Sequence, residues 1–264
     1  MSMDTYRHAM GEKHTTEVSA VNRTIRIIET LRDLQPAGVT EIANAAGQTK
    51  SSVYNHLATL ENEGYVIKTN GEYELGLRFL PLGEAARQRL SVYRAARAEI
   101  EQLGRETGTN AYLSVEERGL ATVIFRHLEN EIDLGSIGTT VPLTTSSMGK
   151  AILAQLPVER VDEIVDRHGF PRMTESSIVD RGALDEELEQ IRQQGFALDK
   201  GEHVKRLRGV GAAILGPDGE VRGAVSVAGP ERELRGPFFE EELPDAVLDV
   251  TNVIELKLME NMSV

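Results

Sequence analysis

One short segment of the chain carries side chains that suit contacts with DNA. It holds Lys50, Ser51, Ser52, Tyr54 and Asn55. Serine hydroxyls and the free amides of a helix start can bind phosphate oxygens, and Lys50 adds positive charge. Asn55 can form two hydrogen bonds with an adenine, and Tyr54 can touch a thymine methyl group or a phosphate. On their own these residues are more typical of a solvated helix face, so the elements that position them decide between the two interpretations.

The sequence around this segment predicts three short helices. Apolar residues recur at helical spacing over 19–34. A second helix starts near Thr40 and stops at Gly47, and a third begins after Thr49 and ends at Gly64. The tight turn between the second and third helices is typical of a helix-turn-helix.

The third helix has a buried side and an exposed side. Its predicted inward residues are Val53, Leu57 and Leu60. Ser51 and Asn55 lie nearly opposite on a helical wheel, so we expect them to face outward. His56 lies at the flank of the buried side, and we expect a packed histidine there before a DNA contact.

A β-hairpin follows the third helix. Asn70-Gly71 joins two runs of alternating residues, which is a strong hairpin pattern. The alternation predicts that these apolar residues share a face: Tyr65, Ile67, Tyr73 and Leu75. Lys68 and Asn70 on this wing can reach a neighbouring phosphate or the minor groove. Residues 18–76 therefore predict a winged helix-turn-helix, and that pattern favours DNA binding.

The charge of the chain is the main argument against this interpretation. The chain has 29 Lys and Arg against 42 Asp and Glu, for a formal net charge of −13. Residues 1–76 hold 10 acidic and 7 basic residues, which leaves 32 acidic and 22 basic residues in 77–264. Most of the acidity is therefore in the second domain. Two half-sites in a dimer would also double the contacts.

Two explanations of the acidic composition are open. Only 7 of the 29 basic residues are Lys. An acidic, lysine-poor surface suits a salt-rich cell interior, as in a halophile, and it equally suits ordinary solubility. The chain has no Cys, which excludes disulfides and thiolate chemistry. It has no apolar run of bilayer length and a polar N-terminus, so we expect a cytoplasmic protein with no membrane contact.

The second part of the chain predicts a connector helix over 77–104 and an α+β domain over 105–264. Pairs of strands with helices between them favour an antiparallel sheet. The expected strands are 110–115, 120–126, 132–134, 196–198, 208–215 and 221–228. The expected helices are 147–156, 158–168, 184–193 and 245–259.

The enzyme motifs that this domain partly resembles are incomplete. The run 146–150 ends like a phosphate-binding loop, but the upstream glycine is missing, and Ala151 replaces the residue that would hold magnesium. Asp199, Glu202 and His203 could hold a metal, although a charged loop is the more common reading of such a cluster. The loop before Ser147 leads into a helix whose first amides could bind a carboxylate, or which is simply N-capped. We therefore predict no catalytic, metal or cofactor site.

From about residue 18 to 262 the chain resembles the IclR family of transcriptional regulators. The matching stretches are 39–43 (VTEIA), 51–61 (SSVYNHLATLE), 63–66 (EGYV), 141–143 (VPL), 148–154 (MGKAILA), 195–199 (GFALD) and 224–230 (AVSVAGP). The resemblance implies a GAF-like effector domain behind the DNA-binding domain. It also implies homodimers or homotetramers that control catabolic genes, with an organic acid or aromatic compound as effector.

The resemblance also implies an effector pocket. Its residues here are Leu143, Ser147, Met148, Asp199, Gly209 and Ser226. The amides near Ser147 and Met148 would meet the carboxylate of the effector, and Asp199 and Ser226 would add polar contacts. Gly209 stands where many members have Cys, which predicts a larger or less polar ligand than a glyoxylate-like acid.

Two alternatives to a ligand-responsive regulator are open. One is an enzyme that transforms a small acid with Asp199 and His203 and retains a vestigial N-terminal domain. The other is a regulator without a ligand, tuned by salt or by a protein partner.

Overall fold

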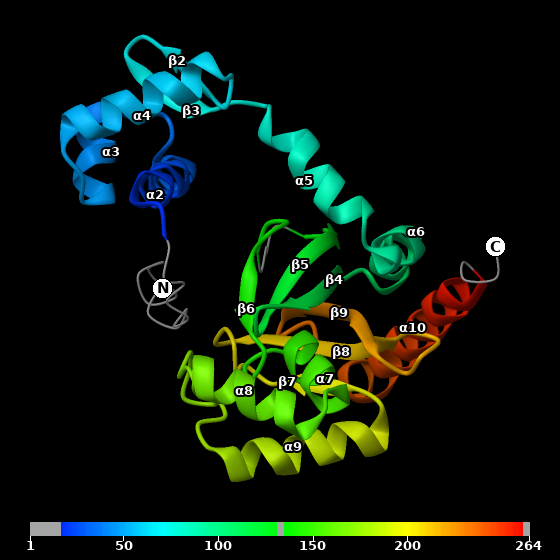
Figure 1. Cartoon of the computed structure of the whole chain (residues 1–264). Coiled ribbons are helices and arrows are strands. Elements are labelled where there is room, and N and C mark those ends of the chain that lie inside the picture. Colours follow the sequence, from blue (N-terminus) through cyan, green and yellow to red (C-terminus); the bar gives the residue numbers. More distant parts are fainter. Residues whose placement is uncertain (1–16, 131–134, 261–264) are drawn as a thin grey trace. The chain divides into compact units, whose positions relative to one another are not determined.

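The computed structural model describes residues 17–130 and 135–260. They form two compact units, and the boundary in the chain falls between Arg89 and Leu90. Figure 1 labels the elements of both units.

The first unit contains four helices and a small sheet among its described residues. In chain order they are α2 (Ser19–Leu34), β1 (Ala37–Gly38), α3 (Val39–Ala46), α4 (Lys50–Asn62), β2 (Val66–Thr69), β3 (Glu72–Leu75) and α5 (Phe79–Gln88). The antiparallel sheet has the order β1-β3-β2. Its core joins α2, α3, α4 and the sheet through Ile27, Leu31, Ile42, Val53, Leu57 and Tyr73. The predicted winged helix-turn-helix is confirmed.

The register of the wing corrects one prediction. Because the turn has only two residues, Asn70 and Gly71, Lys68 pairs with Tyr73 and Val66 pairs with Leu75. Val66 and Tyr73 are therefore buried on one face, whereas Ile67 is exposed on the other. The predicted pairing of Tyr65 and Ile67 with Tyr73 and Leu75 was wrong by one residue, and a shift of one residue exchanges the two faces of a strand.

The connector also differs from the prediction. The stretch 77–104 is not one helix, because α5 ends at Gln88 and a second helix, α6 (Ser91–Thr107), begins after Leu90. None of the described residues of α5 is buried. In contrast, α6 buries Val92, Ile100 and Leu103 in the core of the second unit. The apolar face of α6 thus assigns it to the second unit, whereas α5 falls within the first.

The second unit is built on a six-stranded antiparallel sheet. The strand order is β6-β5-β4-β9-β8-β7. The strands are β4 (Asn110–Glu117), β5 (Leu120–His127), β6 (Thr140–Pro142), β7 (Ala197–Asp199), β8 (Leu207–Leu215) and β9 (Val221–Pro230). Five of the six predicted strands are present, whereas the predicted strand 132–134 lies outside the described residues. The short edge strand β6 was not predicted.

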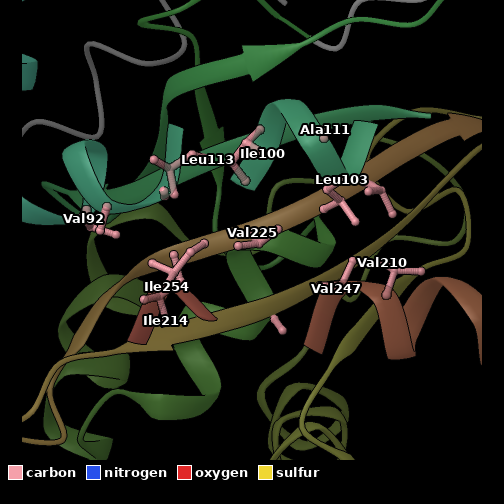
Figure 2. Close-up of a cluster of buried hydrophobic side chains, with 14 of the residues drawn as sticks. Val92, Ile100, Leu103, Ala111, Leu113, Val210, Ile214, Val225, Val247 and Ile254 are labelled. Carbon is pink, nitrogen blue, oxygen red and sulfur yellow. The ribbon is translucent and has the colours of Figure 1, made fainter. Parts of the chain in front are cut away.

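Helices cover both faces of this sheet. They are α7 (Ser147–Gln155), α8 (Val158–His168), α9 (Arg181–Gln194) and α10 (Leu243–Glu260), with a π-helical turn η1 (Phe238–Glu242) before α10. Helices α6 and α10 pack on one face, where Figure 2 shows side chains such as Ile100, Val225 and Ile254 in one hydrophobic cluster. Helices α7, α8 and α9 lie on the opposite face (Figure 1). The predicted α+β domain is confirmed.

Alternation along β9 sends neighbouring side chains to different faces. Val225 and Val227 point into the α6–α10 core, whereas Ala224 and Ala228 belong to the core beneath α7. Since side chains alternate with a period of two, Ser226 also faces α7. The sheet thereby presents a hydroxyl to the start of that helix.

Candidate functional site

Helix α4 presents its predicted side chains to solvent. Lys50, Ser51, Tyr54 and Asn55 are exposed, and Tyr54 is 53% accessible despite its aromatic ring. Ser52 is half-buried instead, and its hydroxyl donates to Gln48 Oε1 at 3.4 Å. The structure therefore brings four of the five α4 residues together on one open face and places Ser52 at its edge.

The start and the orientation of α4 are fixed by two hydrogen bonds. Thr49 is the N-cap, and its hydroxyl accepts from the Ser52 amide at 3.3 Å. His56 Nδ1 bonds the hydroxyl of Thr24 in α2 at 2.8 Å. His56 is thus a packed histidine, as predicted, and it locks the rotation of α4 so that the opposite face stays open.

The wing residues lie at the tip and on the inner face of the hairpin. Asn70 has φ 55° and Gly71 has φ 91°, which is the left-handed pair that a two-residue hairpin turn requires. Asn70 is exposed at this tip. Lys68 is exposed too, and its Nζ lies 5.1 Å from the centroid of the Tyr73 ring.

The second unit contains a cavity between the start of α7 and the sheet. Its empty volume is about 470 Å³, including its opening to solvent. Five of the six predicted pocket residues line it, namely Ser147, Met148, Asp199, Gly209 and Ser226. Leu143 does not line it. Leu143 is buried, and a Cβ on Gly149 would lie 2.6 Å from its Cα, so its backbone supports α7 instead.

Several lining residues were not predicted. They are Tyr112, Val123, Val141, Ser146, Val204, Leu207, Arg208 and Ala228. Tyr112 pairs directly with Ser226 across β4 and β9. Paired residues share a face, so the correct strand register would have identified Tyr112, but the sequence alone does not give the pairing of strands more than 100 residues apart.

The start of α7 leaves backbone donors beside this cavity. The hydroxyl of Ser146 accepts from the Gly149 amide at 3.2 Å, and the Lys150 amide donates to the Ser146 carbonyl at 2.9 Å. The amides of Ser147 and Met148 precede this first helical bond, and such amides have no acceptor inside their own helix. Ser146 thus caps the helix, as one of the two alternatives expected, and amides of this kind also suit an anion, which was the other.

Glycines in β8 allow α7 to approach the sheet closely. A Cβ on Gly211 would lie 2.8 Å from the Ser147 carbonyl carbon and 2.9 Å from the Met148 amide nitrogen. A Cβ on Gly209 would lie 2.9 Å from the Ser147 hydroxyl. All three distances are shorter than real Cβ contacts, so the position of the helix start depends on the absence of side chains at Gly209 and Gly211.

Ser226 places an unpaired hydroxyl in the cavity wall. Its side chain is 1% exposed, and its Oγ has no hydrogen-bond partner within the described residues. A buried hydroxyl without a partner costs free energy, and most such groups in proteins are satisfied. A ligand with a hydrogen-bonding group would satisfy it.

Asp199 and His203 form the polar side of the cavity. Asp199 Oδ1 accepts from the amides of Gly201 at 3.0 Å and Glu202 at 2.7 Å. Burial, together with the nearby Glu202 carboxylate, raises the pKa of Asp199 to about 7. His203 Nδ1 bonds the Thr145 hydroxyl at 3.1 Å, and burial lowers the pKa of His203, which favours a neutral imidazole.

The metal interpretation of this loop gains no support. Both carboxylate oxygens of Glu202 lie within 2.8 Å of Lys150 Nζ, so this residue is engaged in an ion pair. No group of three His, Asp or Glu side chains suited to a metal occurs among the described residues. None of the described helices is long and apolar enough to cross a bilayer.

Comparisons with known proteins agree with the two domains. Residues 20–69 match the IclR helix-turn-helix domain, and residues 84–254 match the family described as bacterial transcriptional regulator IclR C-terminal. The chain is 31% identical over 247 residues to the probable HTH-type transcriptional regulator ArcR of Halobacterium salinarum, covering 91% of this chain and 94% of that protein.

Solved structures share the fold of the whole chain. The IclR structure from Thermotoga maritima superposes with a TM-score of 0.79 at 24% identity, and the match covers 92% of this chain and 99% of that one. An IclR homologue from Microbacterium hydrocarbonoxydans, solved with 4-hydroxybenzoate, gives a TM-score of 0.79 at 20% identity over 91% and 99% of the two chains. The chain belongs to the IclR family of transcriptional regulators.

Proposed function

We propose that the second domain binds a small carboxylic acid and that this binding changes how the first domain holds its operator. The observation that carries the proposal is the buried, unpaired hydroxyl of Ser226, which faces a cavity at the start of α7. In this proposal the cavity binds its ligand and does not transform it.

The chemistry of the wall defines the ligand class. The Ser147 and Met148 amides suit a carboxylate, and the Ser226 hydroxyl and Asp199 suit polar groups elsewhere on the ligand. Tyr112, Val123 and Val141 make part of the wall apolar. Small aromatic acids and sugar acids fit this combination, and the homologue solved with 4-hydroxybenzoate supports an aromatic acid.

The open face of α4 suits the major groove of DNA. Ser51 and Asn55 are exposed there beside Lys50, and no carboxylate occurs in the first turn of the helix. A dimer or tetramer would present pairs of these helices to a palindromic operator. The acid can alter operator affinity only if it binds two arrangements of the protein unequally.

Calorimetry on the full-length protein tests the ligand site. The panel is benzoate, 4-hydroxybenzoate, gluconate and galacturonate, and the variant is Ser226→Ala. We expect the variant to bind the preferred acid about tenfold more weakly, because one hydrogen bond is lost. The free variant should be as stable as the wild type or more stable by ~1 kcal/mol, since the hydroxyl has no partner to lose. Equal affinity of variant and wild type would remove Ser226 from the site.

A gel shift tests the DNA interface. The probe is a palindromic fragment from beside the gene, and the variant is Ser51→Ala with Asn55→Ala. We expect the variant to lose specific retention, because contacts to base edges and phosphates disappear together. Asn62→Ala is the control, since Asn62 is exposed at the opposite end of α4. Unchanged retention of the double variant would rule out α4 as the recognition helix.

A further inference from the structure

Lys150 is a fully buried cation in the second domain. It lies on α7, is 1% exposed and does not line the cavity. Its Nζ donates to Glu187 Oε1 at 2.7 Å, to the Leu198 carbonyl at 2.7 Å, and to both carboxylate oxygens of Glu202 at 2.7 and 2.8 Å. An ammonium group has three N–H donors and no acceptor, so these three acceptor groups satisfy all of its hydrogen-bonding capacity.

These contacts connect two segments that line the cavity, the start of α7 and residues 199–203. Lys150 is three residues after Ser147 on the helix whose first residues, Ser147 and Met148, line the cavity. Its partner Leu198 directly precedes Asp199, and its partner Glu202 directly precedes His203. The Glu202 amide also donates to Asp199 Oδ1 at 2.7 Å. A single side chain therefore links α7 to both polar residues of the opposite wall.

We infer that Lys150 is a positioning residue of the ligand cavity, which holds residues 199–203 at a fixed distance from the start of α7 without touching the ligand. The inference rests on the proposed function for its effect on binding. Its physical content, the tethering of the 199–203 loop, does not depend on any ligand.

The loop has further anchors that do not involve the ammonium group. The Thr174 hydroxyl donates to the Gly201 carbonyl at 2.7 Å, and the Ser177 hydroxyl donates to the Glu202 carbonyl at 2.8 Å. Both anchors hold the backbone of the loop, and the His203–Thr145 bond holds it near the start of α7. Lys150 is the group that holds the Glu202 carboxylate to α7 itself. Removing the ion pair therefore leaves the loop attached but loosens the position of Glu202 relative to α7.

The central variant removes both charges together. Deleting only one partner of a buried ion pair leaves an uncompensated charge and is strongly destabilising, whereas neutralising both partners is often nearly neutral for stability. The variant is thus Lys150→Met with Glu202→Gln. The new Met and Gln side chains are similar in size to the Lys and Glu side chains that they replace. Glu187→Gln is the matched control, because the Glu187 side chain is 29% exposed and its replacement leaves the Lys150–Glu202 pair intact.

Hydrogen exchange of the ligand-free, full-length protein is the first measurement. We expect the Gly201 and Glu202 amides, which donate to Asp199, to exchange at least ~10-fold faster in the double variant, with β8 and β9 unchanged. The Glu187→Gln control should change these rates less than ~3-fold. Wild-type rates in the double variant would overturn the inference. Glu202→Gln alone is the second variant if the double variant does not fold, because Lys150 keeps Glu187 as its counter-charge there. Its exchange should rise by an intermediate factor, and wild-type rates there would also overturn the inference.

Binding of the same four acids is the second measurement. The acid that binds the wild type should bind the double variant at least ~10-fold more weakly and the Glu187→Gln control within ~2-fold, because the wall moves only when the Lys150–Glu202 pair is lost. Unchanged affinity in the double variant would contradict the positioning role. If the wild type binds none of the acids, the proposed ligand class is wrong, and the exchange rates still decide whether Lys150 tethers the loop.

Discussion

At the scale of single residues, Asp199 couples the cavity to pH. Its pKa is about 7 in the folded protein because it is buried and lies near Glu202, against an ordinary value of 3.8. The nearby Lys150 ammonium opposes this rise in the pKa of Asp199. Burial lowers the pKa of the neighbouring His203, which favours the neutral imidazole. Between pH 4 and 7 the folded protein keeps a proton that the unfolded chain loses. The contribution of Asp199 to stability therefore falls as the pH rises through this window.

Asp199→Asn should remove this dependence. Asn retains the oxygen that accepts from the Gly201 and Glu202 amides but cannot ionise. We expect the variant to gain stability relative to wild type at pH 8 and to differ little from it at pH 5. Thermal unfolding at both pH values checks this. A gain of equal size at pH 5 and pH 8 would show that ionisation of Asp199 is not involved.

The affinity for a bound acid should depend on the same ionisation of Asp199. An ionised Asp199 repels a carboxylate in the cavity, so a bound acid should raise the pKa of Asp199 further. If the rise is about one unit, from about 7 to ~8, the acid binds ~5-fold more tightly at pH 6 than at pH 8. Calorimetry at the two pH values measures this, and Asp199→Asn should abolish the difference. The same pH dependence in the variant would assign it to another group.

The residues of the site were predictable to different degrees. The outward face of α4 followed from helical periodicity, because Val53 and Leu57 fix the buried side. Asp199 and Ser226 came only from the family resemblance, since 26 residues separate them in the chain and the sequence alone does not show which strands are neighbours. The function of Lys150 was missed because its partners, Glu187 and Glu202, come together only in the folded domain.

At the scale of secondary-structure elements, the close approach of α7 to the sheet defines the cavity. Gly211→Ala should disturb this contact, because the new Cβ would lie within 3.0 Å of the Ser147 and Met148 backbone. We expect a loss of ~1–3 kcal/mol in the free energy of unfolding, as for overpacked cores, with weaker acid binding.

A second glycine provides the control for this substitution. Gly182 lies in α9, and a Cβ there would approach only the Asp180 carboxylate, at 3.4 Å. Gly182→Ala should therefore be neutral or stabilising by up to ~1 kcal/mol, because Ala favours a helix. Chemical denaturation of both variants gives the comparison. Equal stabilities of the Gly211 and Gly182 variants would show that α7 is not held close to β8.

Long periodic elements were predicted well and short ones were not. Helix α8 has the predicted bounds Val158–His168, and the strands β8 and β9 nearly so. The three-residue strand β6 was missed because so short an edge strand has no measurable alternation. The connector was predicted as one helix because its helical pattern continues across Arg89 and Leu90, whereas the backbone is extended at Leu90 and α6 starts anew after it.

At the scale of the whole molecule, we propose that an acidic protein binds DNA through a face that carries no acidic residue. The net charge is −13, yet the segment 47–59 around α4 contains one Lys and no carboxylate. In this proposal phosphate contacts from α4 are few, and base-edge contacts through Asn55 and its neighbours carry the sequence specificity. The match to a regulator of Halobacterium salinarum suits this composition, because contacts with phosphates weaken steeply as salt rises.

The central claim is that occupation of the cavity in the second domain changes the operator affinity of the first. Fluorescence anisotropy of the operator fragment, with the full-length protein and with or without the preferred acid, measures this directly. We expect the acid to change the operator Kd by at least ~5-fold, the lower range of allosteric coupling. Ser226→Ala should need about tenfold more acid for the same change. An operator Kd that stays the same at saturating acid would contradict the account.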